Sequence, residues 1–156
     1  MGKTKEEVSL LGFGCMRLPT LPDGEIDEEQ AISMIRYAID HGVNYLDTAY
    51  GYHNGKSEGL VGKAVQDGYR EKVFIATKLP VWLVKEPQDC KRLFEEQLER
   101  LGVDYVDFYL LHALNRNSWP QALENEALEF LEQMQAEGRI KHVGFSFHDD
   151  LKVFRE

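Results

Sequence analysis

The 156-residue chain has few of the features that mark membrane, secreted or metal-binding proteins. Its two cysteines, Cys15 and Cys90, lie too far apart for a metal-binding motif, so we expect a reducing, cytoplasmic setting in which both thiols are free. No apolar run approaches the roughly 18 residues of a membrane span, and the N-terminus has no apolar stretch typical of a secretory signal. We therefore expect neither a metal site nor insertion into a membrane.

Basic residues are also scarce, with 18 lysines and arginines against 27 aspartates and glutamates. The resulting net charge of −9 repels nucleic acid, and the chain lacks the basic patch that would draw it to anionic lipid. A composition of 43% hydrophobic and 29% charged residues is typical of a globular protein. No linker-like segment divides the chain, so residues 1–156 are predicted to belong to a single domain.

The chain does contain a regular alternation of two patterns. Segments rich in β-branched and aromatic residues predict strands within 12–18 and over 43–46, 72–77, 105–111 and 141–146, with a short extra segment considered at 8–11. Amphipathic segments predict helices over 27–41, 88–101 and 121–136, a shorter helix capped by Ser57, and one beginning near Asp149. Four glycines fall just past helices, where left-handed backbone is favourable: Gly42, Gly68, Gly102 and Gly138. The alternation predicts parallel strands joined by helical crossovers.

Two α/β architectures fit this repeat. A doubly wound, flavodoxin-like sheet of five strands has the right length. A (β/α)8 barrel of the TIM type has the right repeat but typically needs about 250 residues, so only about its first five strands would be present. Length favours the open sheet, whereas the residues at the strand ends favour the partial barrel.

A polar or ionisable side chain stands at the carboxyl end of each of the last four predicted strands, in the order Asp47, Lys78, His112 and Ser146. In both architectures ligands bind where the carboxyl ends of the parallel strands meet. Each residue alone has a structural explanation, as a helix cap or a solvated rim residue. Four that recur in step with the sheet favour a functional site.

The loop after the second of these strand regions adds Tyr50, Tyr52 and His53. A phenol has a reference pKa of about 10, so it exchanges protons near neutrality only when a nearby cation stabilises the phenolate. Lys78 can supply that charge, and Asp47 can orient Lys78. A hydrogen bond from His112 to a substrate oxygen would complete a site suited to protonating an alkoxide during hydride transfer.

The glycine-containing loops near the first two strands do not match two common nucleotide-binding motifs. The segment Gly51–Ser57 has three residues between its glycines, whereas a phosphate-binding P-loop needs four, so nucleotide hydrolysis is not favoured. After the first strand there is only Gly12-Phe13-Gly14, which does not make a Rossmann dinucleotide-binding fingerprint.

The sequence resembles the aldo-keto reductase family in five segments that run in the family's order across essentially the whole chain: LGFGCMRLP, GVNYLDTAYGYHNGKSE, IATKLP, LERLGVDYVDFYLLHAL and GRIKHVGFSFHD. The resemblance implies a (β/α)8 barrel with a catalytic tetrad of Asp47, Tyr52, Lys78 and His112. It also implies NADPH-dependent reduction of a small-molecule aldehyde or ketone, with Tyr52 as the proton donor.

The same resemblance implies further roles. Candidate cofactor-binding residues are Gly14, Met16, Arg17, Asp47 and Ser146. Of these, Ser146 matches the serine that holds the nicotinamide carboxamide, although the family's following asparagine is replaced by Phe147. Trp82 is a candidate wall of the substrate pocket, and packing over a loop is an equal alternative.

The resemblance stops before the family's sixth to eighth strands and the basic segment that grips the adenosine 2′-phosphate. It is strongest to a branch whose longer members carry a C-terminal iron–sulfur segment, and two isolated cysteines could not hold such a cluster. We therefore expect a truncated chain, a fragment, or one part of a split barrel that associates through its exposed barrel edges. The alternative to a reductase is a non-catalytic partial barrel that pairs with itself or with another chain.

Overall fold

The computed structural model of the chain describes residues 2–155, so Met1 and Glu156, the ends of the predicted domain, lie outside the described residues. Its centre is one parallel sheet with the strands in the order of the chain: β1 (Phe13–Gly14), β2 (Tyr45–Asp47), β3 (Phe74–Leu79), β4 (Val106–Leu114) and β5 (Ile140–Phe147). In a flavodoxin-like sheet the strand order reverses at a switch point. The strictly sequential order is that of a (β/α)8 barrel, of which these are five strands.

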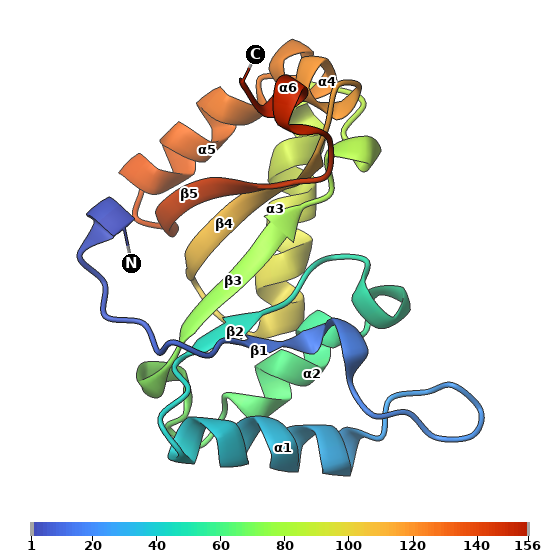
Figure 1. The fold of residues 1–156 in the computed structure, drawn as a ribbon, viewed down its shortest axis with the longest axis vertical. Coiled ribbons are helices and arrows are strands. Elements are labelled where there is room, and N and C mark those ends of the chain that lie inside the picture. Colours follow the sequence, from blue (N-terminus) through green and yellow to red (C-terminus); the bar gives the residue numbers. More distant parts are fainter. Residues whose placement is uncertain (1, 156) are drawn as a thin grey trace.

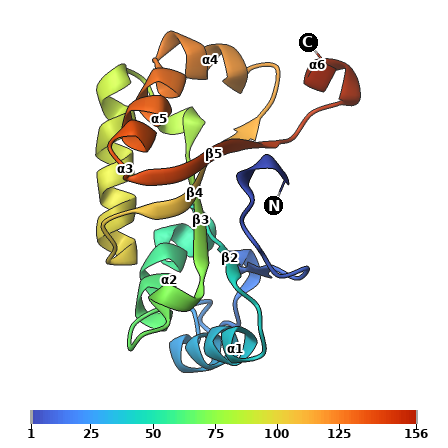
Figure 2. The same ribbon diagram turned by 90° about the vertical axis from the view of Figure 1, so that its left-hand side faces the viewer.

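Within residues 2–155, six α-helices accompany the strands (Figure 1): α1 (Glu28–Asp40), α2 (Ser57–Ala64), α3 (Pro87–Leu101), α4 (Ser118–Glu124), α5 (Ala127–Ala136) and α6 (Leu151–Arg155). Short 3-10 turns lie at Gly2–Thr4 (η1), Cys15–Arg17 (η2), Tyr52–Gly55 (η3), Arg70–Lys72 (η4) and Val81–Leu83 (η5). Figure 2 shows α2, α3 and α5 on one side of the sheet and the N-terminal segment on the other. In the described part of the chain, the sheet therefore has one face covered by α-helices and one face without them.

The main core lies between the sheet and the helices. Ile75 and Leu79 of β3 and Leu111 of β4 are buried there against the apolar stripe of α3, which includes Leu93 and Phe94. Alternate residues of a strand point to opposite faces, so the residues between these positions face away from the helices. Lys78 is one of them, which places its side chain on the face without helices.

Two local expectations are wrong. Ser57 is the first residue of α2 rather than its cap, because its hydroxyl is used elsewhere, in hydrogen bonds with the carbonyl oxygen of Cys15 and the hydroxyl of Thr48. The predicted helix over 121–136 is two helices, α4 and α5, separated at Glu126, whose φ of 55° is left-handed. The chain turns there because α4 packs against η5 whereas α5 packs against β5.

Other local expectations have clear outcomes. No strand forms at residues 8–11, where Ser9 instead exchanges hydrogen bonds with Asn44. The four glycines predicted to end helices all have positive φ, between 65° and 95°, as left-handed backbone requires. The predicted site residues Asp47, Lys78, His112 and Ser146 lie within the last three residues of their strands rather than just after them.

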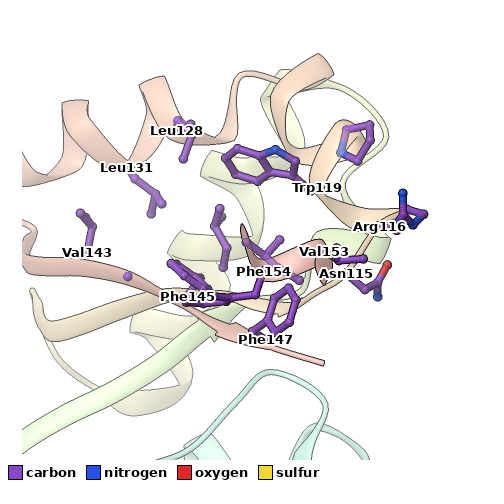
Figure 3. A pocket seen from close by; sticks show the side chains of 14 residues that line it. Asn115, Arg116, Trp119, Leu128, Leu131, Val143, Phe145, Phe147, Val153 and Phe154 are labelled. Atoms are coloured by element: carbon purple, nitrogen blue, oxygen red, sulfur yellow. The ribbon is translucent and has the colours of Figure 1, made fainter. Parts of the chain in front are cut away.

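β5 leaves large apolar side chains exposed at the outer edge of the sheet. Val143 and Phe145 of β5 are 43% and 51% exposed, and α5 covers only part of that face. They line an open groove of about 640 Å³ whose labelled side chains come from β5, α4, α5, α6 and the loop between β4 and α4 (Figure 3). Within residues 2–155, no helix is both long enough and apolar enough to cross a membrane.

Candidate active site

The ammonium group of Lys78 is the centre of a polar cluster at the carboxyl end of the sheet. Its Nζ donates hydrogen bonds to Asp47 Oδ1 and to the main-chain oxygen of Thr48, each at 2.8 Å. A third contact, of 3.2 Å, joins Nζ to the hydroxyl oxygen of Tyr52. The Lys78 side chain is only 5% exposed and that of Asp47 is 33% exposed. A buried cation thus lies between a carboxylate and a phenol.

Strand register and one turn of the chain bring these three side chains together. Asp47 pairs with Ala76, and Lys78 lies two residues further along the same face of β3. After Asp47 the chain leaves the sheet and forms η3, which begins at Tyr52. Left-handed backbone at His53 and Asn54 keeps this loop tight. The tyrosine therefore reaches back over the end of β3 to the lysine.

His112 of β4 lies on the other side of Tyr52. The two rings meet edge to face with centroids 5.9 Å apart. Burial lowers the pKa of His112 to about 4, and Lys78 and His148 act in the same direction. Its Nδ1 atom is buried and has no hydrogen-bond partner within the described chain. The imidazole is therefore neutral at physiological pH. Because Nδ1 is buried, Nε2 is the ring nitrogen available to a ligand.

Trp82 and Ser146 extend the cluster. The indole of Trp82, 44% exposed in η5, lies with its ring centroid 5.0 Å from that of His112. The Ser146 hydroxyl oxygen accepts a hydrogen bond of 2.7 Å from the amide of Ala113, which has a left-handed φ of 56°. The structure thus brings Asp47, Tyr52, Lys78, His112 and Trp82 into one chain of contacts, with Ser146 on the adjoining strand.

The candidate residues of the first strand lie at the other side of Asp47. Gly14 pairs with Asp47 in the sheet, and a Cβ atom at Gly14 would meet no atom within 4 Å, so the space above it is open. Met16 is 46% exposed in η2. The Arg17 guanidinium donates a hydrogen bond of 3.3 Å to the carbonyl oxygen of Met16, which is not a tetrad residue. The structure places Gly14 beside the cluster and leaves Met16 and Arg17 at its rim.

Two further residues of the loop have structural partners. The Tyr50 hydroxyl donates a hydrogen bond of 2.8 Å to Glu96 Oε2, and its ring lies under the Arg100 guanidinium. The ring nitrogen Nε2 of His53 accepts a hydrogen bond from the amide of Leu18. Tyr50 and His53 therefore fasten the loop, and only Tyr52 among these three reaches Lys78.

The two cysteines do not supply a nucleophile to the cluster. Cys15 and Cys90 are free and buried, and burial raises the pKa of the Cys15 thiol to about 12 and that of Cys90 to about 11. Thiols with such pKa values are poor nucleophiles. Across residues 2–155 no group of three or more potential metal ligands comes together.

A buried polar network behind β3 was not foreseen from the sequence. It joins Glu58 of α2, Thr77 of β3, Gln97 of α3 and Tyr109 of β4, and all four side chains are fully buried. One signal could have revealed it, because Gln97 is a polar residue in the otherwise apolar stripe of its helix. The network touches the main chain of Lys78 from the helix side of the sheet.

The apolar groove beside β5 is separate from this cluster. The side chains that line the groove include none of Asp47, Tyr52, His112 and Trp82. Its walls are mainly leucine, valine, phenylalanine and tryptophan (Figure 3). Among the residues lining the groove only Asn115 and Arg116 have polar side chains, whereas a carboxylate, an ammonium, a phenol and an imidazole meet at the end of β3.

Comparisons with known proteins give a consistent result. The sequence profile described as the aldo/keto reductase family matches residues 10–156. A probable aldo-keto reductase 1 of Glycine max is 35% identical over 154 residues, covering 94% of this chain and 43% of the relative. Aldo-keto reductase YhdN of Bacillus subtilis is 34% identical over 150 residues, covering 90% of this chain and 44% of the relative. The chain thus spans less than half the length of these curated relatives.

Solved structures agree with the sequence matches. An aldo-keto reductase from Klebsiella pneumoniae in complex with NADPH is 30% identical, with a TM-score of 0.78 over 95% of this chain and 48% of that one. The thermostable aldo-keto reductase Tm1743, in complex with the inhibitor epalrestat, is 31% identical, with a TM-score of 0.80 over 99% of this chain and 54% of that one.

Proposed function

The chain belongs to the aldo/keto reductase family, and on that premise we propose that it carries the proton-transfer half of a carbonyl reductase active site. The observation that carries the proposal is the position of the Lys78 ammonium, bonded at once to Asp47 Oδ1 and to the Tyr52 hydroxyl. A phenol next to a buried cation is suited to giving up a proton, because the cation stabilises the phenolate that remains. The substrate class is a small aldehyde or ketone.

In the proposed step a hydride adds to the carbonyl carbon while Tyr52 gives its hydroxyl proton to the carbonyl oxygen. The product is an alcohol, and the phenolate is reprotonated from solvent. Lys78 stabilises the phenolate through its 3.2 Å contact, and Asp47 holds Lys78 in place. General-acid assistance of this kind contributes about 10²- to 10⁴-fold to a rate.

His112 acts as a neutral hydrogen-bond donor in this scheme. A buried N–H with no acceptor costs about 1–3 kcal/mol, so the proton of the neutral ring is assigned to Nε2 rather than to the unpartnered Nδ1. An Nε2–H beside the Tyr52 ring can bind the substrate oxygen and polarise the carbonyl. Trp82, against the other side of His112, bounds the space for the rest of the substrate.

The residues present fit the nicotinamide end of a cofactor. Space is open above Gly14, next to Asp47, and the Ser146 hydroxyl keeps its own proton to donate after accepting from Ala113. We assign Gly14, Asp47 and Ser146 to this end, with Met16 and Arg17 at the rim. When bound, NADPH supplies the hydride. The preference for NADPH follows the ligand named for the Klebsiella pneumoniae relative.

The test is NADPH-dependent reduction of a panel of simple aldehydes by the whole 156-residue chain and two tyrosine variants. We expect Tyr52→Phe to lower kcat/KM by about 100-fold or more, because the proton donor is lost. Tyr50→Phe is the matched control, since it removes a hydroxyl from the same loop that bonds Glu96 instead of Lys78. Equal losses in the two variants, or no turnover by the unaltered chain, would contradict the proposal.

A second candidate role is association of partial barrels without catalysis. The exposed Val143 and Phe145 on the outer edge strand favour it, and a second copy of this chain is the occupant we consider. Light scattering of the whole chain distinguishes the roles: a dimer that Phe145→Lys dissociates supports association, and a monomer at all concentrations contradicts it. The free, buried thiols favour a reducing compartment such as the cytoplasm in either case.

A further inference from the structure

The main-chain oxygen of Lys78 lies where the sheet leaves it without a strand partner. On the β2 side of β3, the oxygen of Ala76 accepts a hydrogen bond from the amide of Thr48 at 2.9 Å. The next oxygen on that side belongs to Lys78, because ladder groups alternate along a strand. β2 has already ended at Asp47, since the chain must leave the sheet to bring Tyr52 over Lys78. The geometry that forms the site thus removes a ladder donor.

Gln97 of α3 replaces the missing donor. Its Nε2 lies 3.1 Å from the Lys78 oxygen, 2.6 Å from Glu58 Oε1 and 3.0 Å from Thr77 Oγ1. The side-chain amide is fully buried and approaches β3 from the helix side of the sheet. A buried carbonyl without a partner is costly, so this bond holds the end of β3 in one position.

The orientation of the Gln97 amide is fixed from both ends. Its Oε1 accepts a hydrogen bond of 2.6 Å from the Tyr109 hydroxyl, and its Nε2 donates to the Glu58 carboxylate. Reversing the amide would place Gln97 Oε1 against the Glu58 carboxylate, so that two hydrogen-bond acceptors would face each other. Thr77 strengthens the arrangement by donating 2.6 Å to the same Glu58 oxygen. The network therefore has a single arrangement that satisfies its members.

Close packing of α2 on α3 makes the network possible. A Cβ atom at Gly62 of α2 would lie 2.6 Å from the carbonyl oxygen of Leu101, so only glycine allows this approach. Glu58 lies one helical turn before Gly62 and faces Gln97 at the same contact. The two helices thus deliver a carboxylate and an amide to the back of the strand that carries Lys78.

We propose that Gln97, oriented by Glu58 and Tyr109, is a positioning residue that holds the Lys78 main chain so that its ammonium group stays in contact with Tyr52. This inference rests on the proposed function of the cluster and adds residues that touch neither substrate nor cofactor. It acts through the strand: the network lies on one face of β3 and the lysine side chain on the other. A small shift of the Lys78 main chain would alter the contact between Nζ and the Tyr52 hydroxyl without unfolding the chain.

The test uses the whole chain with tyrosine labelled at its ring Cζ carbon, whose NMR signal reports the surroundings of each hydroxyl. The Tyr52 signal is assigned by its absence in Tyr52→Phe. Gln97→Leu removes the amide while keeping a side chain suited to the helix stripe, and Tyr109→Phe releases only the orientation of the amide. Asp107→Asn is the matched control, because Asp107 is equally buried on the helix side but bonds the other end of β3, at the amide of Ile75.

We expect the Tyr52 signal to move in Gln97→Leu and, by less, in Tyr109→Phe, and to stay in place in Asp107→Asn. In carbonyl reduction, kcat should fall about 10- to 100-fold in Gln97→Leu with KM nearly unchanged, the cost of misplacing a catalytic group by about 1 Å. Should Gln97→Leu fail to fold, Tyr109→Phe decides the question through the same signal and the same kcat.

An unmoved Tyr52 signal in folded Gln97→Leu or Tyr109→Phe would overturn the positioning role, as would an equal movement in Asp107→Asn. The NMR readout needs no turnover. A chain that reduces no aldehyde but shows the expected movement of the Tyr52 signal therefore overturns the proposed function and leaves the positioning role supported.

Discussion

Two buried carboxylates, Glu58 and Asp107, sit behind the sheet at its opposite ends and have different kinds of partner. Asp107, near the amino end of β4, accepts hydrogen bonds of 2.8 Å from both Arg70 and Lys141 and one of 2.9 Å from the amide of Ile75. Glu58, near the carboxyl end of β3, accepts instead from the neutral groups of Thr77 and Gln97, with Arg100 at 3.4 Å.

This difference separates stability from chemistry. At the amino end, Arg70 and Lys141 both pair with Asp107, and both also lie over the Tyr105 ring. Their charges therefore stabilise the fold and are not available to a substrate. At the carboxyl end, the closest donors to Glu58 are neutral and Arg100 lies further away at 3.4 Å. Burial raises the pKa of Glu58, and the Lys78 ammonium points to the other face of the sheet, toward Tyr52. A buried cation facing a phenol, held in place by Asp47, is what the proposed proton transfer needs.

The largest expected effect comes from removing that cation. Lys78→Met keeps the apolar stem and loses the ammonium, so kcat/KM for carbonyl reduction should fall by about 10²- to 10⁴-fold. The free energy of unfolding should fall by only about 1–2 kcal/mol, the cost of the lost hydrogen bonds. Steady-state kinetics and urea denaturation of the same preparations check both values. Activity retained in Lys78→Met would remove the contrast between the two ends.

Asp107→Asn should show the reverse pattern. Loss of the charge leaves Arg70 and Lys141 without their carboxylate, so the free energy of unfolding should fall by about 3 kcal/mol, measured by urea denaturation. Activity should stay within about threefold of the unaltered chain, because distant sites act independently. A loss of activity without a loss of stability would show that the amino end also serves the chemistry.

A smaller effect concerns the charge of His112. Its pKa of about 4 in the folded chain lies below the ordinary value of 6.5, so between those pH values the unfolded chain binds a proton there and the folded chain does not. The stability that the neutral ring contributes is present above pH 6.5 and is lost as the pH falls toward 4. NMR titration of the ring, assigned with His112→Gln, should show it neutral down to about pH 4. A midpoint near 6.5 would count against the donor role.

The smallest effect serves as a baseline for both ends. Lys63 and Glu28 form a surface ion pair at 2.6 Å in which each side chain is more than half exposed. Lys63→Ala should change the free energy of unfolding by less than about 1 kcal/mol, because exposed pairs contribute little. Activity should be unaltered. A larger change in either measurement would show that surface ion pairs contribute to stability or activity as much as the two buried clusters do.

Periodicity and strand order carried much of the prediction. Alternation of side chains along β2 and β3 places Asp47 and Lys78 on one face once the register that pairs Asp47 with Ala76 is known. The position of Tyr52 beside them depends on left-handed backbone at His53 and Asn54, which residue pattern alone does not specify. The family resemblance supplied that residue.

What could not be predicted depends on contacts between distant elements. The break at Glu126 arises because α4 and α5 cover different partners, whereas the apolar pattern runs through both. The role of Gln97 requires knowing that β2 ends before the Lys78 oxygen and that α2 brings Glu58 to the same place. A polar residue in an apolar helix stripe marks the position, but the partner it bonds is set by the tertiary structure.

The contact at Gly62 has a consequence for engineering. Because α2 and α3 meet there backbone against backbone, their spacing is set by peptide atoms and not by the volumes of interchangeable side chains. Libraries that vary the apolar core around these helices should leave the distance between Glu58 and Gln97 almost untouched, whereas a single added methyl group at position 62 acts as a wedge. Gly62 thus fixes the distance between α2 and α3. Apolar residues elsewhere in this core can be substituted while Glu58 and Gln97 keep their positions behind β3.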